Sequence, residues 1–137
     1  MMKKMLFLSI LALSAMNAWS QEQFKGKFHC KEISTTLTID LTAKNIPLKD
    51  LDFDETYGFL KGNLNGTWVI LKIKQINKEK AVVRMVSDSG VDAQDVEFTI
   101  DEEGKNIQMK LIDEQNMKTI DNRKYVKLPK VMTFTKL

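Results

Sequence analysis

The sequence predicts an all-β domain. From Phe24 onward, apolar and polar residues alternate with a period of two, which is the side-chain period of a strand, and helical periodicity is almost absent. Short runs of turn-forming residues, such as Asp88-Ser89-Gly90, separate the alternating stretches. Eight to nine such strands with short links predict a single antiparallel meander closed into a small β-barrel, with a sandwich of two sheets as the alternative.

The first two strands carry the clearest alternation. Phe24, Phe28 and Cys30 share one face, and Leu37, Ile39 and Leu41 share one face of the next strand. The region of Ser34 and Thr35 joins these two strands as a hairpin. The further strands are expected over residues 57–61, 67–76, 81–87, 94–100, 106–112, 117–120 and 131–135.

Residues 42–56 interrupt this rhythm, because the interval is too long for a hairpin loop. It is apolar, with Ile46, Leu48, Leu51 and Phe53, and such side chains are seldom left in water without a reason. Asn45 precedes Ile46-Pro47 and is placed to cap a helix. The sequence therefore predicts one short helical turn that lies on the sheet or plugs one end of it.

Strand parity in 67–76 places Val69, Leu71 and Ile73 inside and Trp68 outside, beside Ile70. A tryptophan on an outer face is either covered by the apolar residues of the 42–56 interval or open as a docking patch, and the cover is favoured. The residues expected to contact a ligand or partner are Trp68, Ile70, Leu48, Leu51, Phe53 and Tyr57.

Residues 1–20 are typical of a secretory signal peptide. Lys3 and Lys4 form the positive segment, residues 5–16 form the apolar segment, and Ala18-Trp19-Ser20 places small residues at the cleavage site. The apolar run is too short for a permanent membrane anchor. We therefore expect a periplasmic or extracellular protein whose mature part, residues 21–137, is a single domain beginning at Gln21 and without a stable membrane anchor.

The composition restricts the classes of partner. Loss of Lys3 and Lys4 from the 21 basic residues leaves 19 against 18 acidic ones, a formal net charge of +1. The lysines at 72, 74, 78 and 80 lack the interleaved aromatic residues of single-strand binding sites. Nothing in this balance indicates a nucleic-acid partner.

The residues that could carry chemistry do not form a known site. Cys30 is the only cysteine and follows His29, the only histidine, so on a strand their side chains point to opposite faces. The shared face of Cys30 with Phe24 and Phe28 predicts a buried, unreactive thiol. An EF-hand loop beginning at Asp50 would need glycine and glutamate where Glu55 and Lys61 stand. We therefore expect no enzyme, no metal and no cofactor, while a looser calcium site at the acidic loops stays open.

The layout resembles that of small secreted calycins, the lipocalin-like proteins. The Gly66-Thr67-Trp68 triplet is similar to the glycine-x-tryptophan of lipocalins, where it belongs to the first strand, whereas here it opens about the fourth. The leader and the lysine-rich, cysteine-poor strands also resemble small uncharacterised exported domains of Bacteroidetes-type bacteria. Together these features predict a non-enzymatic binding module for a small apolar or amphiphilic ligand; the alternative is a periplasmic or cell-surface module that binds an unknown protein.

Overall fold

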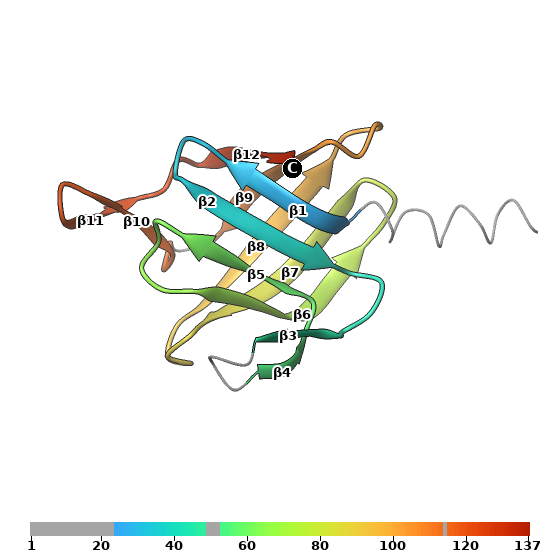
Figure 1. Ribbon diagram of the computed structural model, residues 1–137, viewed down its shortest axis with the longest axis horizontal. Helices are drawn as coiled ribbons and strands as arrows, with labels where there is room; N and C mark the ends of the chain where they lie inside the picture. Colours follow the sequence, from blue (N-terminus) through green and yellow to red (C-terminus); the bar gives the residue numbers. More distant parts are fainter. Residues whose placement is uncertain (1–23, 49–52, 114) are drawn as a thin grey trace, which may run out of the picture.

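Eight antiparallel strands close into a barrel (Figure 1). The structure is a computed structural model that describes residues 24–48, 53–113 and 115–137, so the predicted signal peptide lies outside the described residues. The closed order is β1-β12-β9-β8-β7-β6-β5-β2, in which consecutive barrel strands are neighbours. The barrel strands are β1 (Lys25–Cys30), β2 (Thr35–Asp40), β5 (Gly58–Gly62), β6 (Trp68–Ile76), β7 (Lys80–Ser87), β8 (Ala93–Ile100), β9 (Asn106–Ile112) and β12 (Val131–Lys136).

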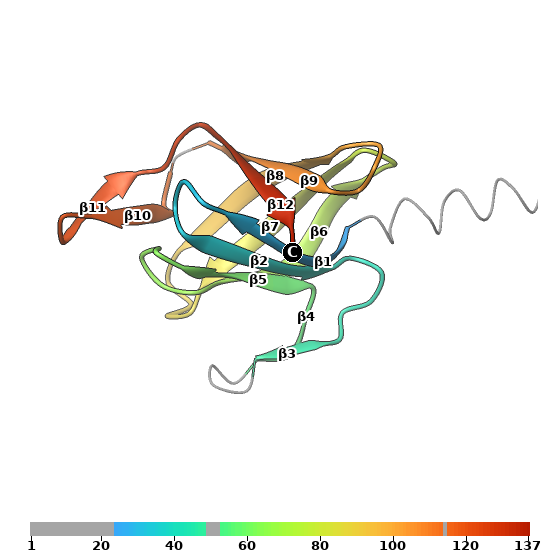
Figure 2. The ribbon, with the colours of Figure 1, turned by 45° about the horizontal axis from the view of Figure 1, so that its top comes forward.

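The meander is interrupted by two hairpins that lie outside the barrel. One is β3 (Ile46–Leu48) with β4 (Phe53–Thr56), inserted between β2 and β5. The other is β10 (Lys118–Asp121) with β11 (Lys124–Lys127), inserted between β9 and β12. Figures 1 and 2 both show β10 and β11 projecting from one end of the barrel. The all-β fold and the barrel are thus as predicted, and the sandwich is excluded.

The expected helical turn is wrong for the described part of residues 42–56, where β3 pairs with β4 instead. Ile46 lies opposite Thr56, and the Thr56 hydroxyl donates to the Ile46 carbonyl oxygen over 2.8 Å. Pro47 has no amide hydrogen, and a short strand outside the barrel tolerates that loss. The described residues contain no helix long and apolar enough to cross a membrane.

The face assigned to Trp68 is also wrong, because β6 contains two irregularities. Its pairing with β7 shifts between Ile70 and Lys72 and again between Ile73 and Gln75. Each shift adds one residue to β6, so the inward side chains come from Trp68, Ile70, Ile73 and Ile76, opposite Ser87, Met85, Val83 and Ala81. Trp68 and Ile70 are therefore core residues with 0% exposure, and they form no outer patch.

The barrel interior is filled by side chains. Phe28, Phe98, Phe134 and Trp68 have no exposed surface, and the buried apolar residues of the described chain are 0–7% exposed. An internal chamber of a few hundred Å³, about the size of a small-molecule site, would leave its wall accessible to water. The interior is therefore packed as an ordinary hydrophobic core. Cys30, which is 1% exposed, belongs to it, as its predicted inward position requires.

Candidate interaction hairpin

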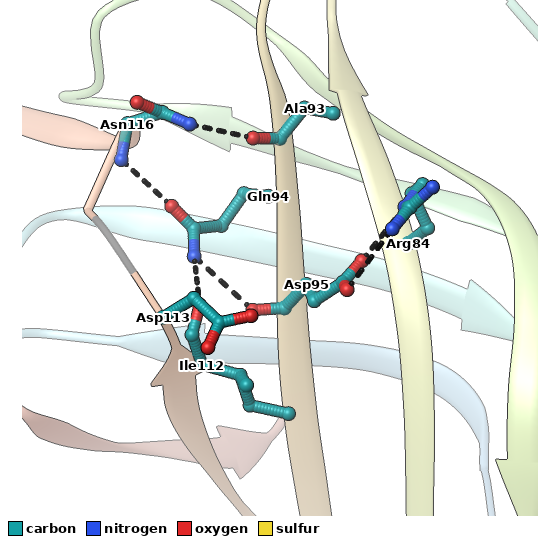
Figure 3. Close-up of a pocket in the computed structure, with 7 residues that line it drawn as sticks. All are labelled: Arg84, Ala93, Gln94, Asp95, Ile112, Asp113 and Asn116. Carbon is teal, nitrogen blue, oxygen red and sulfur yellow. Dashed lines mark hydrogen bonds and ion pairs between the residues drawn. The ribbon is translucent and has the colours of Figure 1, made fainter.

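The exit from β9 toward the β10–β11 hairpin is held by a buried glutamine. Gln94 lies on the inward face of β8 and is 2% exposed. Its side-chain nitrogen donates to the carbonyl oxygens of Ile112 and Asp95, at 3.0 and 3.1 Å, and its side-chain oxygen accepts from the Asn116 amide at 2.8 Å (Figure 3). Asn116 in turn donates to the Ala93 carbonyl oxygen over 2.9 Å. Since a buried amide is costly to leave unpaired, these bonds fix the path of the chain out of the barrel.

A second anchor comes from the loop between β5 and β6. The Asn65 side-chain oxygen accepts from the Trp68 indole nitrogen at 3.1 Å and from the Lys118 amide at 2.9 Å. Its side-chain nitrogen donates to the Asn116 carbonyl oxygen over 2.9 Å. Asn63 donates to the Ile120 carbonyl oxygen over 2.8 Å. The root of β10 is thus joined to the barrel through side chains, and Trp68 belongs to the same network.

Beyond this root, the hairpin turns back in two residues. Asp121 and Lys124 are opposite each other, and the residues between them, Asn122 and Arg123, have φ values of 50° and 65°. Two consecutive positive φ values are typical of a type I′ turn, which matches the right-handed twist of paired strands. Glycine is favoured at the second of these positions, so an arginine there carries some backbone strain.

The hairpin exposes an apolar pair. Ile120 and Tyr125 are cross-strand partners, so their side chains share one face, and they are 37% and 65% exposed. Val126, on the other face, is 37% exposed. Large apolar side chains at these exposures are the exception in this otherwise well-buried chain, and three of them lie within one short hairpin.

The hairpin is also basic. It carries Lys118, Arg123, Lys124 and Lys127, and its one acidic residue is Asp121. Lys118 lies directly opposite Lys127, and like charges in that position destabilise a strand pair. The ion pairs found among the described residues lie elsewhere, at Lys74, Arg84 and Asp95 and at Lys105 and Glu103. The positive charge of the hairpin therefore has no ion-pair partner in the described chain.

A polar cleft of about 330 Å³ lies beside the hairpin root. Its walls are Arg84, Ala93, Gln94, Asp95, Ile112, Asp113 and Asn116 (Figure 3). The Arg84 guanidinium donates to both oxygens of Asp95, at 2.9 and 3.2 Å, and Lys74 adds a third bond at 2.9 Å. These bonds, with Arg84 the largest cause, lower the pKa of Asp95 to about 2, and the carboxylate raises the pKa of Arg84. A carboxylate with so low a pKa is a weak base, and the side chains of Gln94 and Asn116 are already hydrogen-bonded within the fold.

A second cleft, of about 410 Å³, lies on the outside where β1 meets β12. His29 lines it, and its Nδ1 lies 3.0 Å from the Thr36 hydroxyl. The Cys30 side chain belongs to the core, so the predicted separation of the two side chains is confirmed. No group of three potential metal ligands occurs in the described part of the chain, while Asp50 and Asp52 lie outside it.

The structure does not bring the residues predicted from the sequence together as a site. Trp68 and Ile70 are inside the barrel, and Tyr57 is half-buried, with the Lys44 ammonium 5.8 Å from its ring centre. Leu48 and Phe53 belong to β3 and β4, and Leu51 lies outside the described residues.

The strand expected over residues 117–120 is present as β10, but neither the strand β11 nor a site role for the hairpin was predicted. Ile120 and Tyr125 stand at equal distances from the centre of Asp121-Asn122-Arg123-Lys124, a symmetry typical of a two-residue hairpin. That symmetry is the signal that could have identified them.

No protein-family model matches the chain, so its resemblance to lipocalins stays a prediction. Likewise, no curated protein and no solved structure is significantly similar to it.

Proposed function

We propose that this protein is an exported, non-enzymatic module that binds another protein through the β10–β11 hairpin. This is the second of the two functions that the sequence predicts. Two observations together support it. The barrel interior is filled, and the projecting hairpin, whose root is held by hydrogen bonds, exposes Tyr125 and Ile120.

The filled interior favours a protein partner over a small apolar ligand. A small ligand needs a concave site that surrounds most of its surface. The inward aromatic side chains Phe28, Phe98 and Trp68 occupy the space that such a ligand would take. The two clefts described above are open to solvent and do not enclose a ligand-sized space. A binding surface on the outside of the barrel is therefore the better explanation.

The hairpin has the properties of a recognition element. Tyrosine and arginine are enriched among the residues that dominate protein interfaces, and Arg123 and Tyr125 lie two residues apart near the tip of the hairpin. Asn63, Asn65 and Gln94 hold its root, so little conformational freedom would be lost there on binding. The predicted signal peptide supports a partner in the periplasm or at the cell surface.

The test uses protein purified from its own host after mild crosslinking, with native mass spectrometry as the readout. Tyr125→Ala should lose the bound partner, since truncation of a central tyrosine weakens binding by roughly tenfold or more. The matched control is Val91→Ala, which truncates an apolar residue that is 82% exposed in a different turn. It should retain the partner. A bound small molecule in place of a protein, or a partner that Tyr125→Ala retains, would contradict the proposal.

A further inference from the structure

The outer edge of β11 is open. Among the described residues β11 pairs with β10 alone, so its second edge has no strand beside it. In a two-residue hairpin the residues next to the turn, here Asp121 and Lys124, exchange hydrogen bonds. The direction then alternates along the strand, so the amide and carbonyl groups of Tyr125 and Lys127 point away from β10. These groups are placed to bond another extended chain.

The charges on this edge discriminate between candidate strands. Lys124 and Lys127 are exposed, as are the other two residues of β11. A second copy of β11 would bring lysines against lysines, which opposes pairing between identical edges. The same lysines would attract carboxylates on a different chain. Charge therefore disfavours self-association and favours an acidic partner strand.

The order of side chains along β11 specifies the partner further. Lys124, Tyr125, Val126 and Lys127 present a basic residue, two apolar residues and a basic residue. Directly opposed side chains share a face, so a complementary strand carries an acidic residue, two apolar residues and an acidic residue. This pattern reads the same in both directions. Such a partner must supply a peptide backbone as well as negative charge, and a lipid surface supplies only the charge.

We infer that the free edge of β11 binds an extended protein segment of the pattern acidic-apolar-apolar-acidic, which adds a third strand to the β10–β11 hairpin. The inference rests on the proposed function and names the partner's chemistry. Backbone bonds to Tyr125 and Lys127 supply the pairing, and ion pairs to Lys124 and Lys127 supply the selection.

The probe is a capped peptide with the core Glu-Val-Val-Glu between threonines, and its Kd is measured against the whole protein by isothermal titration calorimetry. In antiparallel addition the first Glu and the second Val lie opposite Lys127 and Tyr125. N-methylation of these two residues should weaken binding at least tenfold, since it removes both amide donors. N-methylation of the first Val and the second Glu is the matched control, because these amides point away from β11, and binding should persist. A Lys-Val-Val-Lys core should bind at least tenfold more weakly.

The protein side is tested with Lys127→Pro against Lys127→Ala. Both remove the charge, but only proline removes the outward amide, and an edge strand tolerates that loss. Lys127→Pro should bind the probe at least tenfold more weakly than Lys127→Ala. The Tyr125 and Ile120 resonances in NMR spectra check that the hairpin stays folded in both.

Four outcomes would overturn the inference. The first is that the wild-type protein does not bind the probe. The second is that the two N-methylation patterns have equal effects, which indicates attraction by charge alone. The third is that vesicles of phosphatidylglycerol and phosphatidylcholine displace the probe from the protein, at lipid concentrations too low for the vesicles to bind the Lys-Val-Val-Lys peptide. This result would indicate that the hairpin binds a membrane surface. The fourth is that the Tyr125→Ala variant no longer binds the crosslinked native partner, whereas the Lys127→Pro variant still binds it. In that last case the proposed function stands and only strand addition fails.

Discussion

The barrel and the β10–β11 hairpin use the same antiparallel pairing, but they place different side chains against water. In the barrel, Phe28 pairs with Leu37 and both are fully buried, whereas in the hairpin Ile120 pairs with the largely exposed Tyr125. The charged pairs also differ. In the barrel Arg84 lies opposite Asp95, whereas in the hairpin Lys118 lies opposite another lysine, Lys127. A sequence that follows the packing rules throughout one region and departs from them in another marks the second region as the place where function is to be sought.

Thiol labelling should show the largest difference between the two regions. Tyr125→Cys places a second thiol in the hairpin, while Cys30 stays in the core. Because Cys30 is reached only by unfolding, we expect it to react slower than the new thiol by a factor of at least about 10³. Mass spectrometry of protein treated with iodoacetamide should detect one adduct in buffer and two in urea. Two rapid adducts in buffer would show that the barrel opens and would contradict the core position of Cys30.

Truncation should separate the two regions in stability. Phe98→Ala empties a fully buried position and should lower the free energy of unfolding by about 3–5 kcal/mol. Tyr125→Ala should change it by less than about 0.5 kcal/mol, because the ring is mostly in solvent. Urea unfolding followed by circular dichroism measures both. A loss above 1.5 kcal/mol in Tyr125→Ala, on the order of a buried-group effect, would assign the hairpin to the fold rather than to binding.

The root of the hairpin should show an intermediate effect. Asn65→Ala leaves the Trp68 indole nitrogen and the Lys118 amide without their acceptor and should cost about 1–3 kcal/mol. The Lys118 amide should exchange faster with solvent, and the fluorescence emission of Trp68, expected at short wavelength for a buried ring, should shift to the red. Asn45→Ala, at an exposed position, is the matched control and should leave both unchanged. Unaltered exchange at Lys118 in Asn65→Ala would mean that the hairpin is held by other contacts.

The smallest expected effect is the pH dependence contributed by Asp95. Its pKa is lowered to about 2 by Arg84 and Lys74, so the folded state binds its proton less readily than the unfolded state, in which the pKa is about 3.9. The stabilisation is therefore complete above about pH 5 and is lost progressively as the pH falls toward 2. We expect about 1 kcal/mol, because the Arg84 side chain is 48% exposed. Asp95→Asn should reduce the loss of stability between pH 5 and pH 2.5, and an unchanged pH profile would refute the contribution.

Much of the fold could be predicted from the sequence because most barrel strands alternate without interruption. The inward positions of Phe24, Phe28 and Cys30 and of the strand after them are as predicted, since one uninterrupted strand has one parity. Trp68 was assigned to the wrong face because parity was counted along β6 as if it were regular, and the shifts in its pairing are properties of two strands together.

The hairpins were harder to predict for local reasons. In β3 the proline and the preceding asparagine resemble the start of a helix, and only the pairing of Ile46 with Thr56 decides for a strand. In β11 three of the four residues are polar or aromatic and exposed, so no alternation is visible. The turn before it has arginine at the position where glycine is the usual sequence signal of such a turn. The candidate site was therefore missed because its residues break the very patterns that reveal buried strands.

The irregular strand β6 has a consequence for chain length. Leu71 and Lys74 are the two residues without a partner in β7. Deleting both would leave a shorter strand in perfect alternation, with the same four inward side chains. The two residues add nothing to the inward set; what such insertions contribute is bending and twist of the strand that carries them. Curvature of this kind is what a sheet needs in order to meet its own first strand. The choice between a closed barrel and two flat layers, which alternation alone leaves open, is thus encoded in part by two insertions, and a variant lacking both would show how far closure depends on them.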